Sequence, residues 1–446
     1  MGNEKDYIAT RVSYALDLMG PSLAVNSACS SALAAVAQAA QALLTGQADM
    51  ALAGGAALTF PGHGYLYEEG LVNSTDGRVR PFDAAANGTV FGDAVGAVVL
   101  KREADALADD DNILATMLGF GMSNDGARKV GYAAPGVAGQ RAAIDAALQM
   151  AAVDASTITY VECHATGTLI GDGIELRALG ESYRAAGAVP AEGQPPWCAI
   201  GSVKGSIGHA NAAAGVTGLI KTCLCLQRKQ LVPTAHFERL NAKVVLAGTP
   251  FYVHEGGGAG GGAAPWPRRK GGGGGGGAPG SEVPRRAAVS SFGIGGTNVH
   301  CVLEEPPARA DGVLVAAPRS HQLLTLSAKT PAALRRVAVQ LASWLDDRAV
   351  GGAAPLPRVA HTLHLGREQY AHRLAVVVAD RAEAADRLRD AAGARADSTP
   401  PYAPCTPLQS PHQPLSPLHS PVAPPLQASS PTQRPPAARA RRPRCC

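Results

Sequence analysis

The sequence predicts a layered α/β domain over residues 1–305 with a core of small side chains, and three observations support this prediction. Up to residue 255, short β-branched runs alternate with longer alanine-rich helical runs, and glycines separate them. This alternation is typical of a sheet that is covered by helices. Hydrophobic residues make up 46% of the chain, which is enough for a large core, whereas aromatic residues make up only 4%. We therefore expect a core of small side chains.

The overall charge is nearly balanced, with 40 Lys and Arg against 36 Asp and Glu and a net charge of +4. A balance of this kind favours neither a nucleic acid nor a membrane surface as a partner. No run of about 18 uncharged apolar residues is present, so we expect no membrane span.

The nine cysteines are odd in number and irregularly spaced. They predict no disulfide framework and a reducing, cytoplasmic setting.

The first segment with possible chemistry is Ser22–Asn26, an extended run that leads into an alanine-rich helix over residues 31–44. Cys29 lies at this junction. The free N–H groups and the positive dipole end of a helix favour a thiolate, so we expect the pKa of Cys29 to fall from about 8.5 to roughly 3.5–7.5. Cys29 is therefore a candidate nucleophile, although an inert core residue is the commoner fate of a single cysteine.

Two histidines follow further predicted strands. His164 comes directly after the β-rich run that begins at Tyr160, and the hydroxyls of Thr166 and Thr168 beside it are suited to an amide-bearing ligand. His209 closes a second strand-and-glycine segment, which also contains Lys204. In isolation a single histidine is more often structural, and a single lysine is more often a solvated surface residue.

A glycine turn at Phe292–Asn298 joins two predicted strands within Arg286–Glu305. Its spacing does not fit G-x-G-x-x-G, so we interpret it as a turn that presents backbone N–H groups and not as a nucleotide site. Residues 256–280 contain 14 glycines in 25 positions. This tract is predicted to be a flexible surface loop.

The remaining chain is predicted to form a small appendage and a tail. In residues 306–395, the apolar positions of 322–347 fit a strand and an amphipathic helix, and residues 359–392 add helix, strand and helix. The last 46 residues contain 13 prolines with repeated P-x-x-P spacing. Residues 396–446 are therefore predicted to be disordered.

Four motifs carry a resemblance to a known family. NSACSSALAA resembles the DTACSSSL nucleophile motif of the β-ketoacyl synthase domains of modular, type I polyketide synthases. VECHATGTLIGDGIEL is similar to their EAHGTGTxxGDPIE, GSVKGSIGHANAAAG to their KxxxGHxxxAAG, and SSFGIGGTNVHCVLEE to their closing motif. With the flanking segments, the resemblance covers nearly all of residues 8–390.

The resemblance implies a thiolase-like, layered α-β-α-β-α fold and a role for each matching residue. Cys29 would carry an acyl chain as a thioester. His164 and His209 would hold the carbonyl of a malonyl thioester while carbon dioxide leaves. Lys204 would tune the charge of the histidines, and the backbone N–H groups of Cys29 and Ile294 would form the oxyanion hole.

The same resemblance implies the partners of the domain. An acyl carrier protein would deliver the substrate on a phosphopantetheine arm, which Thr166 and Thr168 would bind. Family members pair the strand before the nucleophile across a two-fold axis, so a homodimer is expected. Residues 306–395 are similar to the linker that follows such synthases. No cofactor, metal or nucleotide is required by this chemistry.

The sequence departs from the family in three places. Asn26, Ser27 and Ala165 replace the usual Asp, Thr and Gly of the motifs, and the glycine tract at 256–280 expands what is normally a short loop. In addition, only 28 residues precede Cys29, where family members have a longer stretch. We therefore expect that the amino-terminal part of the domain is absent here, as in a fragment, or is supplied by another polypeptide.

Two alternatives to a condensing enzyme follow. The first is an inactive ketosynthase remnant that acts as a dimer or scaffold module, with the proline-rich tail as a polyproline ligand. The second is a thiolase that uses coenzyme A. The paired histidines and the TGT and GGTN sequences match a thiolase less well than they match a synthase.

Overall fold

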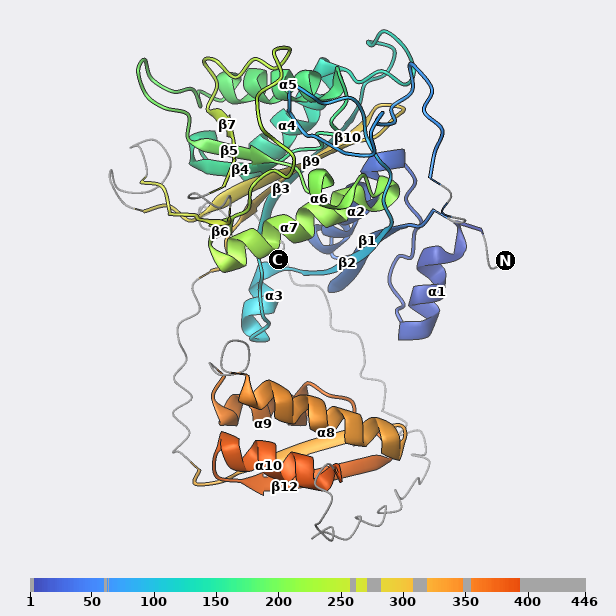
Figure 1. Cartoon of the computed structure of the whole chain (residues 1–446), viewed down its shortest axis with the longest axis vertical. Coiled ribbons are helices and arrows are strands. Elements are labelled where there is room, and N and C mark those ends of the chain that lie inside the picture. Colours follow the sequence, from blue (N-terminus) through green and yellow to red (C-terminus); the bar gives the residue numbers. More distant parts are fainter. Residues whose placement is uncertain are drawn as a thin grey trace, which may run out of the picture. The chain divides into compact units, whose positions relative to one another are not determined.

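The computed structural model describes residues 4–59, 62, 64–256, 262–270, 282–307, 319–347 and 354–393. These residues form two compact units, one up to residue 307 and one from residue 319 (Figure 1). Much of the predicted glycine-rich loop, at 257–261 and 271–280, and the whole predicted tail at 396–446 lie outside the described residues.

The larger unit alternates strands with helices. Its α-helices are α1 (Tyr7–Leu16), α2 (Ser31–Leu44), α3 (Glu103–Ala108), α4 (Val137–Ala151), α5 (Gly171–Ala185), α6 (Lys204–Ile207) and α7 (Ala214–Arg228). Three short 3₁₀ helices are η1 (Ala28–Ser30), η2 (Ala155–Thr157) and η3 (Asn211–Ala213). The strands are β1 (Met50–Ala57), β2 (Ala94–Lys101), β3 (Thr116–Asn124), β4 (Ile158–Glu162), β5 (Cys198–Gly201), β6 (Gln230–Leu231), β7 (Phe251–Val253), β8 (Ala264–Pro265), β9 (Arg286–Phe292) and β10 (Thr297–Glu304).

A six-stranded mixed sheet in the order β3-β10-β9-β4-β5-β7 forms the centre of this unit. Strands β9, β4, β5 and β7 run parallel, whereas β10 is antiparallel to both of its neighbours, β3 and β9. The parallel strands are joined through helices, as parallel pairing requires, and the β9-β10 hairpin closes through the glycine turn. The predicted α/β class is confirmed.

Helices cover both faces of the sheet (Figure 1). Helices α4 and α5 pack on one face, and α2 and α7 pack on the other. The two-stranded antiparallel sheet β1-β2 lies on the far side of α2 and α7. The helices α2 and α7 are therefore enclosed between two sheets, and α2 buries eight of its side chains, four of them alanines.

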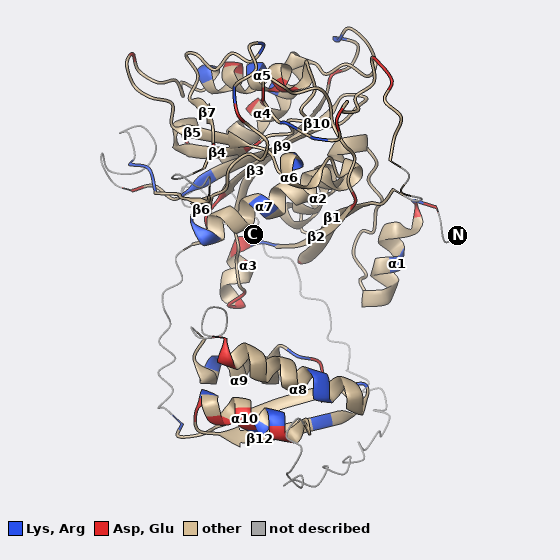
Figure 2. Cartoon of the chain, in the orientation of Figure 1, with Lys and Arg blue, Asp and Glu red and all other residues tan. Residues whose placement is uncertain are grey.

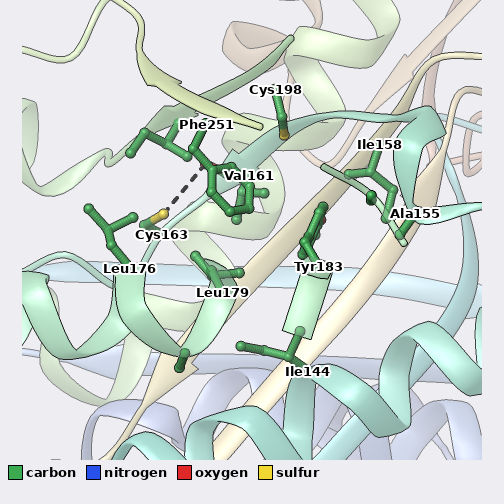
Figure 3. Close-up of a cluster of buried hydrophobic side chains, with 14 of the residues drawn as sticks. Ile144, Ala155, Ile158, Val161, Cys163, Leu176, Leu179, Tyr183, Cys198 and Phe251 are labelled. Atoms are coloured by element: carbon green, nitrogen blue, oxygen red, sulfur yellow. Dashed lines mark hydrogen bonds between the residues drawn. The ribbon is translucent and has the colours of Figure 1, made fainter. Parts of the chain in front are cut away.

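Strand β4 shows how the sheet separates two cores. Val161 and Cys163 point into the core beneath α4 and α5, where Ile144 and Tyr183 also lie (Figure 3). Tyr160, which precedes Val161, belongs to the opposite core beneath α2 and α7. This alternation follows from the two-residue repeat of a strand. His164 follows Cys163, just beyond a strand that is buried on both of its faces.

The predicted strand at Ser22–Asn26 is not formed. Residues 19–27 contain neither helix nor strand, and the 3₁₀ helix η1 leads directly into α2. Extended backbone becomes a strand only when a neighbouring strand accepts its hydrogen bonds, and this segment has none among the described residues of the chain.

Apolar side chains remain exposed on the outer side of β1-β2. Leu52 and its cross-strand partner Val99 lie on the open face of this sheet, as does Val95. Helix α1 buries none of its residues and also exposes Ile8.

The smaller unit contains β11 (Gln322–Ala328), α8 (Pro331–Asp346), α9 (Leu356–Leu365), β12 (His372–Val378) and α10 (Arg381–Ala391). The two strands pair antiparallel, and the three helices share one apolar core with them. Strand, helix, helix, strand and helix is the order that the sequence predicts.

Charged residues of both signs are interspersed along the larger unit (Figure 2). Among the described residues, no helix is long and apolar enough to cross a membrane.

Candidate active site

Cys29 lies in the 3₁₀ helix η1, at the buried start of α2. The preceding residue, Ala28, has a φ of +53°, a left-handed conformation that costs energy for a residue with a Cβ. The turn is held in place by Ser31, whose Oγ accepts a hydrogen bond from the Ser27 N–H at 2.9 Å and donates one to the Ala28 carbonyl at 2.7 Å. The Cys29 carbonyl accepts a hydrogen bond from Ser291 of β9 at 2.9 Å. The nucleophile is therefore anchored both to the helix and to the sheet.

The predicted fall in the pKa of Cys29 is wrong in direction. Burial raises the pKa of this thiol, since a thiolate loses hydration inside the protein. A hydrogen bond from the Ile294 N–H and the charge of Lys204 act in the opposite direction and offset part of this effect. The Ile294 N–H and Lys204 thus stabilise the thiolate form of Cys29, and the helix dipole alone does not decide its charge.

His164 lies two residues beyond the end of β4, and its backbone is held by Glu175 of α5. The two carboxylate oxygens of Glu175 accept hydrogen bonds from the N–H groups of His164 and Ala165, both at 2.7 Å. Burial raises the pKa of Glu175 to about 7. Ala165 is buried without a positive φ, so the extra methyl group at this position is accommodated.

Asp172, one turn before Glu175 in α5, holds the neighbouring loop. Its carboxylate accepts hydrogen bonds from the N–H groups of Gly167 at 3.1 Å and Phe82 at 2.8 Å, and burial raises its pKa to about 6. The hydroxyls of Thr166 and Thr168 lie 3.1 Å apart in this loop and are partly exposed. They are available to a ligand that enters past the loop.

His209 lies between α6 and η3, so it does not directly follow a strand as its sequence pattern predicts. The backbone N–H of Asn211 donates a hydrogen bond to its Nδ1 at 3.1 Å. In a neutral imidazole one ring nitrogen accepts and the other donates, so this contact places the proton on Nε2. Burial and the charge of Lys204 lower the pKa of His209 to about 3.

The three side chains converge although they come from distant parts of the sequence. The Cys29 Sγ and one ring nitrogen each from His164 and His209 all lie within 4.8 Å of one another. The two imidazole rings are 5.4 Å apart and nearly perpendicular. Burial, Lys204 and His209 lower the pKa of His164 well below its usual value. Both histidines are therefore neutral at neutral pH, and an N–H group of a neutral imidazole can donate to a carbonyl oxygen next to the sulfur.

Lys204 begins α6 and is buried beside this cluster. Burial lowers its pKa, whereas the carboxylates of Glu162, Glu175 and Asp172 raise it. Glu162 also accepts a hydrogen bond from the N–H of Val203 at 2.6 Å, and so supports the start of α6. The acidic groups thus favour the charged form of a lysine whose field acts on Cys29 and on both histidines.

The charge of Lys204 is expected to control the ionisation of Cys29. In the variant Lys204→Met, the pKa of Cys29 should rise further, and each unit of increase slows alkylation by iodoacetamide about tenfold at a fixed pH below the pKa. Alkylation is followed at the Cys29 peptide by mass spectrometry over a range of pH.

The matched control is Lys221→Met, since Lys221 pairs with Glu162 at 2.8 Å and is not among the groups that set the pKa of Cys29. An alkylation profile that is the same in both variants would contradict the role of Lys204.

The glycine turn Phe292–Asn298 approaches η1 closely. A Cβ on Gly293 would lie 2.2 Å from the Ser27 carbonyl oxygen, so only glycine fits there. The Asn298 side chain donates a hydrogen bond to Asp125 at 2.8 Å, and this contact ties the turn to the end of β3. The turn thereby directs the Ile294 N–H at the Cys29 sulfur.

Four acidic residues support this site, although the sequence predicts no role for them. Three of them lie within the motif VECHATGTLIGDGIEL and the fourth follows β3, and all four are buried. They are Asp125, Glu162, Asp172 and Glu175. For Asp172 and Glu175 a signal was present in GDGIE, where two acids three residues apart open a helix and therefore share one face.

Comparisons with known families give three matches along the chain. Residues 1–106 match the family described as the beta-ketoacyl synthase N-terminal domain, and residues 114–238 match the beta-ketoacyl synthase C-terminal domain. Residues 325–395 match the RhiE-like, KS-MAT linker domain.

Similar proteins come from bacterial polyketide synthases. A protein of the phenolphthiocerol/phthiocerol polyketide synthase of Mycobacterium tuberculosis is 45% identical over 391 residues, which are 87% of this chain and 24% of that protein. Ketosynthase twelve of the bacillaene polyketide synthase of Bacillus amyloliquefaciens has a TM-score of 0.76 at 35% identity, over 88% of this chain and 64% of that one. An oxazolomycin ketosynthase domain of Streptomyces albus has the same TM-score and identity, over 88% and 63%. The chain spans about a quarter of the curated relative and just under two thirds of the solved domains.

Proposed function

Because this chain belongs to the β-ketoacyl synthase family, we propose that it joins an acyl chain on Cys29 to a malonyl group carried by an acyl carrier protein. It is a ketosynthase domain of the polyketide synthase type, with the thiolase-like fold of its structural neighbours, and such domains are condensing enzymes of the acyltransferase class. One observation carries the proposal for this chain. A thiol and two neutral imidazoles lie within 4.8 Å of one another, and the charge of Lys204 acts on all three groups.

Acyl loading is the first step. The Cys29 sulfur attacks the thioester carbonyl of the incoming acyl group, and the carbonyl oxygen becomes an oxyanion. The N–H groups of Cys29 and Ile294 receive this charge. When the intermediate collapses, the bond to the phosphopantetheine sulfur breaks, and the proton from Cys29 leaves with the carrier thiol.

Decarboxylation of the extender follows. The malonyl thioester oxygen accepts hydrogen bonds from His164 and His209, and the bond to the carboxylate breaks. Carbon dioxide leaves, and the electron pair forms an enolate whose oxygen the two N–H groups stabilise. Neutral rings are needed, because they donate hydrogen bonds without giving up a proton to the enolate. Burial keeps the rings neutral, and the charge of Lys204 acts in the same direction by opposing a second positive charge.

Condensation completes the cycle. The enolate carbon attacks the acyl carbonyl on Cys29, and a second oxyanion forms at the same two backbone N–H groups. Collapse breaks the bond to the Cys29 sulfur, which leaves as a thiolate and regains a proton. The β-ketoacyl product remains on the carrier.

We further propose the setting in which this reaction occurs. The carrier arm binds through the hydroxyls of Thr166 and Thr168, which are partly exposed next to His164. The chain acts as a homodimer in the cytoplasm, where cysteines stay reduced, and six of its cysteines are free thiols in the structure. The donors described above supply the stabilisation of each step, so the proposed reaction uses no cofactor.

The proposal predicts a defined product. The full chain, mixed with acyl-carrier and malonyl-carrier protein, should give a carrier whose intact mass corresponds to acyl plus malonyl minus carbon dioxide. Product formation is measured by mass spectrometry of the carrier. A thiolase would instead cleave acetoacetyl-coenzyme A with free coenzyme A, and the same preparation is tested for that reaction. A folded chain that gives neither loading nor product would contradict the proposal.

A scaffold role is the second candidate, and the exposed apolar residues favour it. Leu52, Val95 and Val99 on the open face of β1-β2, together with α1, offer apolar surface to another protein. Light scattering and the loading assay separate the two functions. A dimer or larger assembly that accepts no acyl group supports the scaffold, whereas acyl loading on Cys29 supports the enzyme.

A further inference from the structure

Phe91 contacts the catalytic cluster, and the mechanism above gives it no role. It lies in the loop just before β2, in a short segment that pairs with the backbone of His209. The His209 N–H donates a hydrogen bond to the Val90 carbonyl at 2.7 Å, and the Gly92 N–H donates one to the His209 carbonyl at 3.1 Å. Two hydrogen bonds thus fix Phe91 opposite His209.

Two glycines make this contact close. A Cβ on Gly92 would lie 2.3 Å from the Ile207 carbonyl oxygen, and one on Gly208 would lie 2.9 Å from the Val90 carbonyl oxygen. Gly208 also has a φ of +75°, which disfavours any other residue. The two backbones can therefore not separate or slide without breaking the pairing.

The Phe91 ring covers one face of the His209 imidazole. The ring centroids are 5.4 Å apart and the planes are inclined by 29°. His209 is 2% exposed, whereas Phe91 is 39% exposed, so the phenyl ring meets solvent in place of the imidazole. The polar and charged groups that face His209 are the Asn211 N–H on Nδ1, the ring of His164, the Cys29 sulfur and Lys204.

We propose that Phe91 is a positioning residue for the decarboxylation step. Phe91 excludes water from His209 and holds the plane of the imidazole so that its Nε2–H faces the extender carbonyl. The inference rests on the proposed function, because it assigns Phe91 to the histidine that holds the extender. Asn211 sets which nitrogen carries the proton, but a single hydrogen bond at Nδ1 leaves the ring free to tilt about that contact. A stacked phenyl ring removes this freedom.

The physical consequence is a change in the charge of His209. Burial is the first cause of its low pKa, and Lys204 is the second. Removing the phenyl ring admits water to one imidazole face, so the pKa of His209 should rise towards its usual value near 6.5. The protonated ring predominates below its pKa and also carries a proton on Nδ1, so it can no longer accept the hydrogen bond from the Asn211 N–H that orients it. The variant should therefore lose decarboxylation as the pH falls through that higher pKa. His164, on the other side of the cluster, keeps its own contacts.

The test compares Phe91→Ala with Phe91→Tyr, which keeps the ring, in two separate assays. Loading of Cys29 is followed by intact mass, and decarboxylation by release of carbon dioxide from malonyl-carrier protein. Phe91→Ala should lower decarboxylation by up to about fourfold at about pH 6, where a histidine with a pKa near 6.5 is about three-quarters protonated, and much less at about pH 8. Its loading rate should stay close to that of the parent, and Phe91→Tyr should restore decarboxylation at both pH values.

The outcomes separate this inference from the proposed function. His209→Ala is measured in the same assays. If His209→Ala lowers decarboxylation but Phe91→Ala leaves both its rate and its pH profile unchanged, the role of Phe91 is wrong and the proposed function stands. If His209→Ala itself has no effect, the proposed function fails. A parallel loss of loading and decarboxylation in Phe91→Ala, without rescue by Phe91→Tyr, would show general damage and would also overturn the inference.

Discussion

Replacing Cys29 by alanine is expected to abolish acyl loading, with a fall of at least about 10³-fold, because the substitution removes the atom that forms the thioester. Backbone contacts such as the hydrogen bond from Ser291 to the Cys29 carbonyl remain, so the chain should still fold. Loading is measured as the increase in intact mass after incubation with an acyl-carrier protein. Condensation should be lost in the same variant.

Two further variants make this result specific. Cys29→Ser keeps a hydroxyl at the same place, but a hydroxyl is a much weaker nucleophile at neutral pH, so loading should stay far below that of the parent. Cys223→Ala, on the partly exposed side of α7, is a matched cysteine control that should load normally. Undiminished loading of Cys29→Ala would mean that another group carries the acyl chain.

Loss of either histidine is expected to slow decarboxylation by about 10²–10³-fold, since one preorganised donor to an oxyanion contributes about 2.7–4 kcal/mol. His164→Ala and His209→Ala should each show this fall when carbon dioxide release from malonyl-carrier protein is measured. Acyl loading should fall much less, because it relies on the N–H groups of Cys29 and Ile294.

The double variant of His164 and His209 should lose less than the product of the two single effects, because the two donors act on one oxygen. His361→Ala, an exposed histidine of the smaller unit, is the control and should leave both steps unchanged. Equal loss of loading and decarboxylation in the single variants would contradict the division of roles between the histidines and the oxyanion hole.

Local patterns were sufficient for much of the fold. The alternation of short strands and alanine-rich helices predicts the α/β class, and the β9-β10 hairpin and the elements of the smaller unit are found in the predicted order. These features depend on side-chain spacing and on glycine, which act over a few residues. The segment Ser22–Asn26 shows the limit of that reasoning. Its extended pattern is real, but a strand also needs a neighbour, and pairing is not a local property.

The supporting residues show a similar limit. Glu175 and Asp172 are polar residues in a helix that would ordinarily face solvent, and their sequence alone does not say that they are buried. Only in the folded chain do they accept the N–H groups that hold His164 and Gly167. Phe91 likewise gives no sign in its own segment that it will stack on His209.

The sequence by itself determined the identity and local setting of the reactive groups: a cysteine that opens a buried helix, a histidine just past a strand end and a glycine turn that presents backbone N–H groups. Tertiary structure decided their distances and their charges. It brought Cys29, His164 and His209 within 4.8 Å of one another, and it raised the pKa of Cys29 where the helix dipole alone predicts a fall. The physical reason is that desolvation and charge interactions depend on which distant segments surround a group, whereas spacing along the chain reports only how the backbone turns there.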